Sequence, residues 1–157
     1  MSIHHRPLLI ALGLIAAFMI IYVIFGWFGW GLQASNEQAI GEISRWCERV
    51  SAGVFREPSN ALSNLGFMFA GLMMLRILST DSDYLLGLNQ FFGHNPVSLL
   101  YAGSVIWLGG GSMLMHGTHT GWGASADNLS MVMYILIPWL FNLSQMAGWC
   151  TKKLLII

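Results

Sequence analysis

Charged residues are scarce in this sequence of 157 residues. Lys, Arg, Asp and Glu make up 9% of it, whereas 55% is hydrophobic. Soluble domains usually carry about 25% charged residues, so this composition cannot cover a water-facing surface and indicates a protein that is dissolved in lipid. The net charge at pH 7 is zero, which gives no electrostatic reason to expect a nucleic-acid partner.

Cysteine is nearly absent too. Cys47 and Cys150 form no CxxC pattern, which argues against a zinc-thiolate site. The topology derived below places them on opposite membrane faces, so we expect no disulfide within the chain. No internal repeat or low-complexity run is found.

Long hydrophobic runs are what the sequence does contain. The first follows Pro7 and is long enough to cross about 30 Å of hydrocarbon. It is too long for the apolar core of a typical signal peptide, the alternative reading, so we expect a retained anchor. Trp27 and Trp30 near its end suit the aromatic belt at a membrane interface.

Three further spans are expected after the anchor, at 58–78, 97–116 and 127–149, separated by polar segments at 36–57, 80–96 and 117–126. The sequence therefore predicts an all-α, polytopic membrane helix bundle with about four spans. Residues 1–33 form the amino-terminal anchor, and residues 34–157 form the membrane domain.

The orientation follows from the basic residues, because cytoplasmic flanks are enriched in Lys and Arg. Four spans place both termini on one side, with Arg6, Arg76, Lys152 and Lys153, and leave Arg45, Arg49 and Arg56 on the other. We therefore expect both termini in the cytoplasm. The start of the second span, the end of the third and the start of the fourth then share the opposite face.

Polar residues gather on that opposite face. In GGGSMLMHGTH, Ser112 and His116 are four residues apart, which places them on one face of a helix. Three glycines, 109–111, precede them and permit close helix packing. An imidazole here can bind a metal or move protons, and an interfacial histidine bonded to a neighbouring carbonyl is the alternative.

Asp127 is the second candidate. A carboxylate in hydrocarbon costs about 2.5–3.5 kcal/mol on insertion scales, so its presence needs a reason. One reason is to cap the amino terminus of the fourth span. The other is chemistry: a short turn makes spans three and four antiparallel neighbours, so we expect Ser112, His116 and Asp127 to lie within about 5–6 Å of one another.

The third polar element begins at Glu57, directly before Pro58, a favoured first residue of a helix. Asn60, Ser63 and Asn64 follow at three- and four-residue spacing and so line one face of the second span. We expect this face to point into the bundle, either for hydrogen bonding between helices or as part of a site.

Four motifs occur together in a fixed order: WCE, then EPSNALSN, then GGGS with a histidine four residues after the serine, then an aspartate eleven residues beyond that histidine. Over roughly 46–134 this pattern resembles the alkaline ceramidase family. That family belongs to a superfamily of membrane hydrolases that includes adiponectin-receptor-like proteins.

The resemblance implies part of a seven-helix hydrolase that holds zinc with three histidines and cleaves the amide of ceramide. His116 matches the first zinc ligand, Ser112 the serine next to the metal and Asp127 the aspartate beside it. The other two ligands of the family form an HxxxH pair, which this sequence lacks. The resemblance therefore covers only the amino-terminal portion of such a fold, and the first span is extra relative to it.

The family also has a calcium site around WCE. Trp46, Glu48 and Glu57 match three of its ligands, whereas Arg45 and Val50 stand where the family has an aspartate and an asparagine. Calcium is therefore left open by the sequence.

Two hypotheses result. The leading one is a ceramidase-like, zinc-dependent hydrolase of linear lipid amides, incomplete in this chain. The alternative is a catalytically inactive membrane scaffold or interaction protein of the same fold.

The topology can be tested by labelling single cysteines with a membrane-impermeant reagent. Glu37→Cys and Gly121→Cys, in a background without Cys47 and Cys150, should label from the same membrane face. Labelling from opposite faces would show that the predicted arrangement is wrong.

Overall fold

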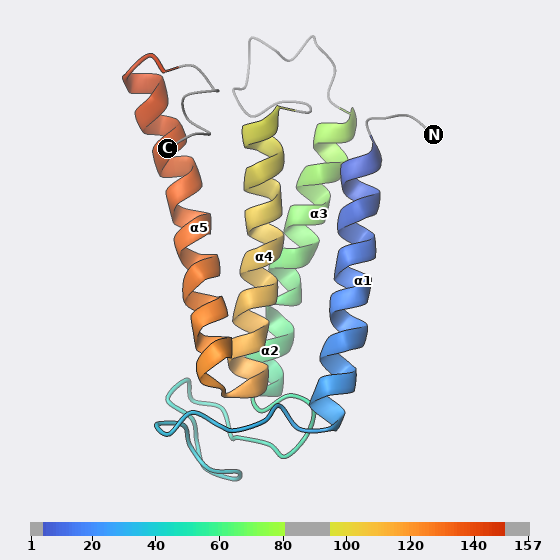
Figure 1. The fold of residues 1–157 in the computed structure, drawn as a ribbon, viewed down its shortest axis with the longest axis vertical. Coiled ribbons are helices and arrows are strands. Elements are labelled where there is room, and N and C mark those ends of the chain that lie inside the picture. The colour runs from blue at the N-terminus through green and yellow to red at the C-terminus, as the bar shows by residue number, and fades with distance from the viewer. Residues whose placement is uncertain (1–4, 81–94, 150–157) are drawn as a thin grey trace.

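The fold is a bundle of helices, described by a computed structural model for residues 5–80 and 95–149 (Figure 1). Its helices are α1 (Arg6–Trp27), α2 (Pro58–Ser63), α3 (Leu65–Thr80), α4 (Pro96–Thr118) and α5 (Gly121–Met146). Since α2 and α3 form one interrupted stretch, four stretches are long and apolar enough to cross a membrane. The predicted all-helical fold with four membrane spans is confirmed.

The helices run side by side, and α4 lies between α5 and α3 (Figure 1). The first residue of α1, the end of α3, the start of α4 and the end of α5 lie at one end of the bundle. At the other end, the segment 28–57 passes beneath α2 and the turn between α4 and α5. In the described residues this segment contains no helix, and its one bridge pairs Ile43 with Arg49.

The turn between spans three and four is shorter than predicted. We expected a polar turn at 117–126 and a fourth span that begins at Asp127, and both expectations are wrong. Capping, one of the two roles considered for Asp127, is excluded as well. Helix α4 continues to Thr118, and α5 begins at Gly121 after Thr120, whose side chain accepts a 3.1 Å hydrogen bond from Gly123 N. With the cap filled by Thr120, Asp127 lies inside α5.

The second span is interrupted at Asn64, between α2 and α3. The Asn64 side chain donates to Asn60 O over 2.8 Å. Asn64 is buried as predicted, but Ser63 is exposed, and its hydroxyl is satisfied by Asn60 O at 2.9 Å. The expectation that Ser63 points into the bundle is therefore wrong.

Glycines bring α4 close to its neighbours. A Cβ on Gly109 would lie 2.6 Å from Asn64 O, and one on Gly111 would lie 2.7 Å from Ala126 O. Both distances are too short for any side chain, so α4 approaches the second span and α5 backbone to backbone. The predicted role of the glycine run is confirmed at these two positions.

Helix α1 packs onto the bundle through Tyr22, which is 1% exposed and donates its hydroxyl to Met113 O over 3.0 Å. A Cβ on Gly117 would lie 1.3 Å from that hydroxyl. Beyond the end of α1, the Trp30 indole donates to Val54 O over 2.9 Å. These contacts fasten both α1 and the chain that follows it to the rest of the fold.

Some predictions fall outside the described residues. They concern most of the loop expected at 80–96, the histidines His4 and His94, and Cys150, Lys152 and Lys153.

The glycine contacts predict unequal effects of one small substitution. Gly109→Ala and Gly111→Ala should each destabilise the protein by about 1–3 kcal/mol, the usual cost of overpacking. Gly103→Ala is the matched control, because nothing lies within 4 Å of its added Cβ. It should be neutral or stabilising, since alanine favours helix over glycine by about 1 kcal/mol. Thermal unfolding in detergent measures the difference, and equal melting temperatures for all three variants would contradict the packing.

Candidate functional site

The carboxylate of Glu57 is the centre of a buried polar cluster. Its side chain is 0% exposed. Oε2 accepts from His116 Nδ1 at 2.7 Å and from Asn60 Nδ2 at 2.9 Å, and Oε1 accepts from His119 Nε2 at 2.9 Å. An ionised carboxylate only accepts, so each of these ring nitrogens carries the proton.

Backbone contacts hold Glu57 in this place. Its N–H donates to His116 O over 3.0 Å, and Arg56 N donates to Gly117 O over 3.1 Å. The last carbonyls of a helix have no partner within it. The segment before α2 thus satisfies the carboxyl end of α4, and this pairing carries Glu57 to both histidines.

The charge of Glu57 is stabilised by its neighbours. Burial alone would raise the pKa of this carboxyl, but hydrogen bonds from Ser44, Asn60 and His116, together with attraction to His116, outweigh it. The pKa of Glu57 is therefore lowered from its ordinary value, and the carboxylate form is favoured.

His119 continues the cluster toward the segment beneath the bundle. It is 1% exposed and adopts a left-handed backbone conformation with φ 53°. Its Nδ1 lies 3.8 Å from Oε2 of Glu37, beyond hydrogen-bond distance, and the other oxygen of Glu37 pairs with Arg45. Four groups thus follow one another in space: Glu37, His119, Glu57 and His116.

Trp46 closes the other side of His116. Their ring centroids are 4.9 Å apart in an edge-on arrangement, and the guanidinium of Arg45 lies 4.6 Å from the centre of the Trp46 ring. Together, Trp46 and Glu57 leave the His116 ring little freedom to turn.

Glu48 lies at the start of α2. Its two oxygens accept from the backbone nitrogens of Ser59, at 2.7 Å, and Asn60, at 2.8 Å. A carboxylate is favourable at a helix amino terminus because it satisfies free N–H groups and opposes the helix dipole. Glu48 and Glu57 thus both lie near the start of the second span.

Ser112 lies on α4 and Asp127 on the neighbouring helix α5. Gly111 of α4 approaches Ala126 of α5. Because the two helices are antiparallel (Figure 1), Ser112 and Asp127 lie one residue to either side of this contact, about 3 Å apart along the helix axes. Asp127 Oδ1 is buried and has no hydrogen-bond partner in the described part of the chain. In that part, no hydrogen bond joins Ser112, His116 and Asp127, and their predicted separation stays a prediction.

The two residues also share a side of the helix pair. Tyr101 on α4 and Tyr134 on α5 stack with centroids 5.9 Å apart. Eleven residues, from Tyr101 to Ser112, make about three helical turns, and seven, from Asp127 to Tyr134, make about two. Ser112 and Asp127 therefore lie on the side of α4 and α5 that the stacked tyrosines mark.

One histidine of this cluster is arranged as a zinc ligand would be. Metal-bound histidines usually donate their second ring nitrogen to a carboxylate, as His116 Nδ1 does to Glu57. This bond leaves Nε2 of His116 for a metal. Within residues 5–80 and 95–149, no three His, Cys, Asp or Glu side chains form a group that could hold one.

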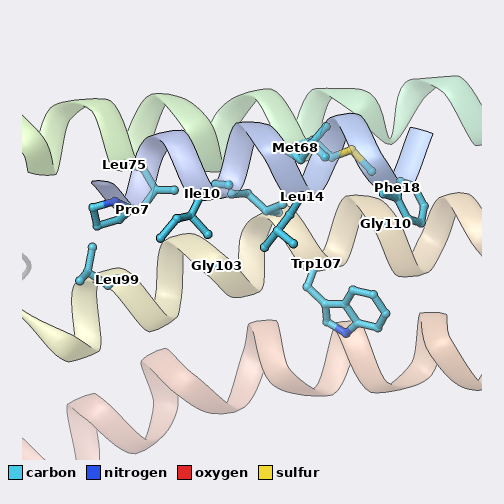
Figure 2. A pocket seen from close by; sticks show the side chains of 13 residues that line it. Pro7, Ile10, Leu14, Phe18, Met68, Leu75, Leu99, Gly103, Trp107 and Gly110 are labelled. Atoms are coloured by element: carbon cyan, nitrogen blue, oxygen red, sulfur yellow. The ribbon is translucent and has the colours of Figure 1, made fainter. Parts of the chain in front are cut away.

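A cavity lies between α1, α3 and α4 (Figure 2). This groove of about 560 Å³ has an apolar lining, with Ile10, Leu14 and Phe18 of α1 facing Gly103 and Gly110 of α4. Ser112 follows Gly110 by two residues, a turn of about 200° around the helix. The groove is thus on the other side of α4 from Ser112 and is separate from the polar cluster.

Sequence reasoning missed the pairing at the centre of the site. The sequence suggests Glu57 only as a calcium ligand, a role that it leaves open, and His119 matches neither of the other two zinc histidines of the family. The only hint is a histidine pair at the end of a span, His116 and His119, with an acid before a helix-starting proline on the same face. Nothing in their spacing shows that one carboxylate bonds both rings.

Comparison with known proteins gives no match: no protein-family profile, no curated protein and no solved structure is similar to this chain.

The lowered pKa of Glu57 predicts how stability depends on pH. The carboxylate stabilises the fold above its ordinary pKa of 4.5, and this contribution is lost as pH falls from there through the lowered pKa of the folded state. Glu57→Gln should lower stability at neutral pH by about 1.5–3 kcal/mol for each charge-assisted hydrogen bond lost. It should also flatten the decline in acid.

Melting temperatures between neutral pH and pH 3 measure both effects. Glu42→Gln is the matched control, since Glu42 is exposed and its carboxylate accepts a hydrogen bond from the nearby Ala39 N. Parallel pH curves for wild type and Glu57→Gln would contradict the assigned charge.

Proposed function

We propose that this chain carries one zinc ligand and two polar catalytic groups of a ceramidase-like hydrolase, which cleaves the amide bond of a lipid. The observation that carries the proposal is His116, whose Nδ1 donates to the buried Glu57 and whose Nε2 is left for a metal. The order of the motifs from Trp46 to Asp127 supports the same reaction class.

Zinc, when bound, would lower the pKa of a water molecule to about 7 and polarise the amide carbonyl. In this proposal the chain's own residues perform the remaining tasks. Asp127 accepts the proton of the attacking water, for which a buried carboxylate oxygen without a partner is suited. The Ser112 hydroxyl donates a hydrogen bond to the oxygen that becomes negative.

A lipid substrate fits the setting of these groups. His116 lies in the last turn of α4, where a membrane span ends. A lipid lying in the bilayer presents its polar head and first amide at that depth, while its chains stay in the hydrocarbon. We further propose that both termini face the cytoplasm, on the evidence of the basic residues, so that the site faces the opposite side.

The same cluster also supports the alternative of an inactive scaffold. Glu57 satisfies two histidines and an asparagine within the protein. Such a closed network can fasten a loop to a bundle with no chemistry. The hydrolase function requires a bound metal ion, whereas the scaffold function does not.

The ligand count predicts that this chain binds zinc weakly. Catalytic zinc normally has three protein ligands, and the sequence contains no HxxxH pair to supply two of them. We expect weak zinc binding and slow or undetectable hydrolysis of a fluorescent ceramide by the purified chain. Metal analysis and a turnover assay with added zinc measure these outcomes.

Any zinc or turnover that is found should be lost in His116→Ala. His5→Ala, at the other end of the bundle and outside the cluster, is the matched control and should have no effect. Turnover that survives His116→Ala would refute the proposed site. Zinc binding equal in both variants would favour the scaffold.

A further inference from the structure

We propose that Glu57 is a positioning residue that fixes the ring of His116, and that protein donors in place of a calcium ion hold the segment around Trp46 and Glu48. The role of His116 rests on the function proposed above, whereas the absence of calcium does not. Both parts of the proposal rest on the hydrogen-bond donors that contact the carboxylate oxygens of Glu48 and Glu57.

Every group that would bind calcium already faces an N–H donor. Calcium takes six to eight oxygen ligands at about 2.3–2.6 Å. Both oxygens of Glu48 accept backbone N–H groups of α2, and both oxygens of Glu57 accept from imidazoles. A cation would have to compete with four hydrogen bonds of 2.7–2.9 Å, two of which satisfy the first turn of a helix. Oε2 of Glu57 already accepts from two donors.

The Asn60 side chain occupies the position between two of these ligands. Its Nδ2 lies 2.9 Å from Oε2 of Glu57 and 3.5 Å from the carbonyl oxygen of Trp46. Both neighbours are acceptors, so the nitrogen of the amide must face them. One N–H₂ group thus joins the two oxygens that a bridging ion would otherwise join.

Arg45 and His119 also oppose the binding of calcium. Arg45 stands where the family has an aspartate, and its guanidinium lies over the Trp46 ring and pairs with Glu37. A fixed positive charge beside the segment opposes a second cation. His119 takes the remaining oxygen of Glu57 and is itself 1% exposed.

These contacts determine the tautomer of His116. In a neutral histidine, the hydrogen bond that one ring nitrogen makes decides which of the two nitrogens carries the proton. Donation to Glu57 requires the proton on Nδ1, so Nε2 has the lone pair. The edge-on contact with the Trp46 ring limits rotation of the His116 ring. The lone pair on Nε2 therefore points in one direction.

Nitrogen NMR of the zinc-free protein, labelled at its histidines and held in detergent without lipid substrate, tests the positioning role. We expect His116 to carry its proton on Nδ1 and His119 to carry one on Nε2. In Glu57→Gln one of the two oxygens becomes an NH₂ group, which donates. The ring that faces this group can no longer donate to it, so at least one of the two signatures should change. Glu48→Gln, which alters the same segment without touching a histidine, should leave both unchanged.

A wild-type spectrum with the His116 proton on Nε2 would overturn the positioning role, and so would unchanged signatures in Glu57→Gln. The first result needs no variant to fold. Neither depends on zinc binding or on turnover, so the positioning role and the proposed hydrolase function can fail separately.

Thermal unfolding tests the part that concerns calcium. A ligand that binds only the folded state raises its melting temperature. We expect millimolar Ca²⁺ and the chelator EGTA to give the same melting temperature in wild-type protein. A rise with Ca²⁺ that EGTA reverses, and that Glu48→Gln abolishes, would overturn the proposal.

Discussion

A carboxylate that is wholly removed from solvent must be hydrogen-bonded, because the cost of burying an unpaired charge is several kcal/mol. Glu57 is fully hydrogen-bonded only if α4 ends at Thr118 and the chain turns at His119, because these two features bring both histidine rings to its carboxylate. The same bonds place the segment 28–57 against the bundle and start α2 at Pro58. The candidate site is therefore also the joint between that segment and the membrane spans.

Close packing of α4 makes this joint possible. Gly109 lets α4 touch the second span at Asn64, and Gly111 lets it touch α5 at Ala126. With those two contacts fixed, His116 lies beside Glu57, the residue that precedes α2, and Ser112 and Asp127 lie on the same side of the α4–α5 pair. In a bilayer, helices gain little from apolar burial between them, so small residues that allow backbone contact decide which faces meet.

The spans could be predicted from sequence because length and apolar composition alone define them. The start of the fourth span could not: GTHTGWGASAD contains small polar residues typical of a turn, yet Thr120 caps a helix that begins at Gly121. The partners of Glu57 were also beyond prediction. They depend on the left-handed turn at His119 and on the path of the segment 28–57, which no local pattern determines.

The two sides of α4 are unlike, and the difference explains where chemistry can occur. One side carries Gly103 and Gly110 along an apolar groove next to α1, and Gly117 beneath the hydroxyl of Tyr22. Ser112 lies on the other, and a polar side chain at membrane depth must face protein or a water-filled cavity rather than lipid. Asp127 lies on the same side of the α4–α5 pair as Ser112. The polar groups of this pair therefore share one side, while α1 covers the apolar side of α4.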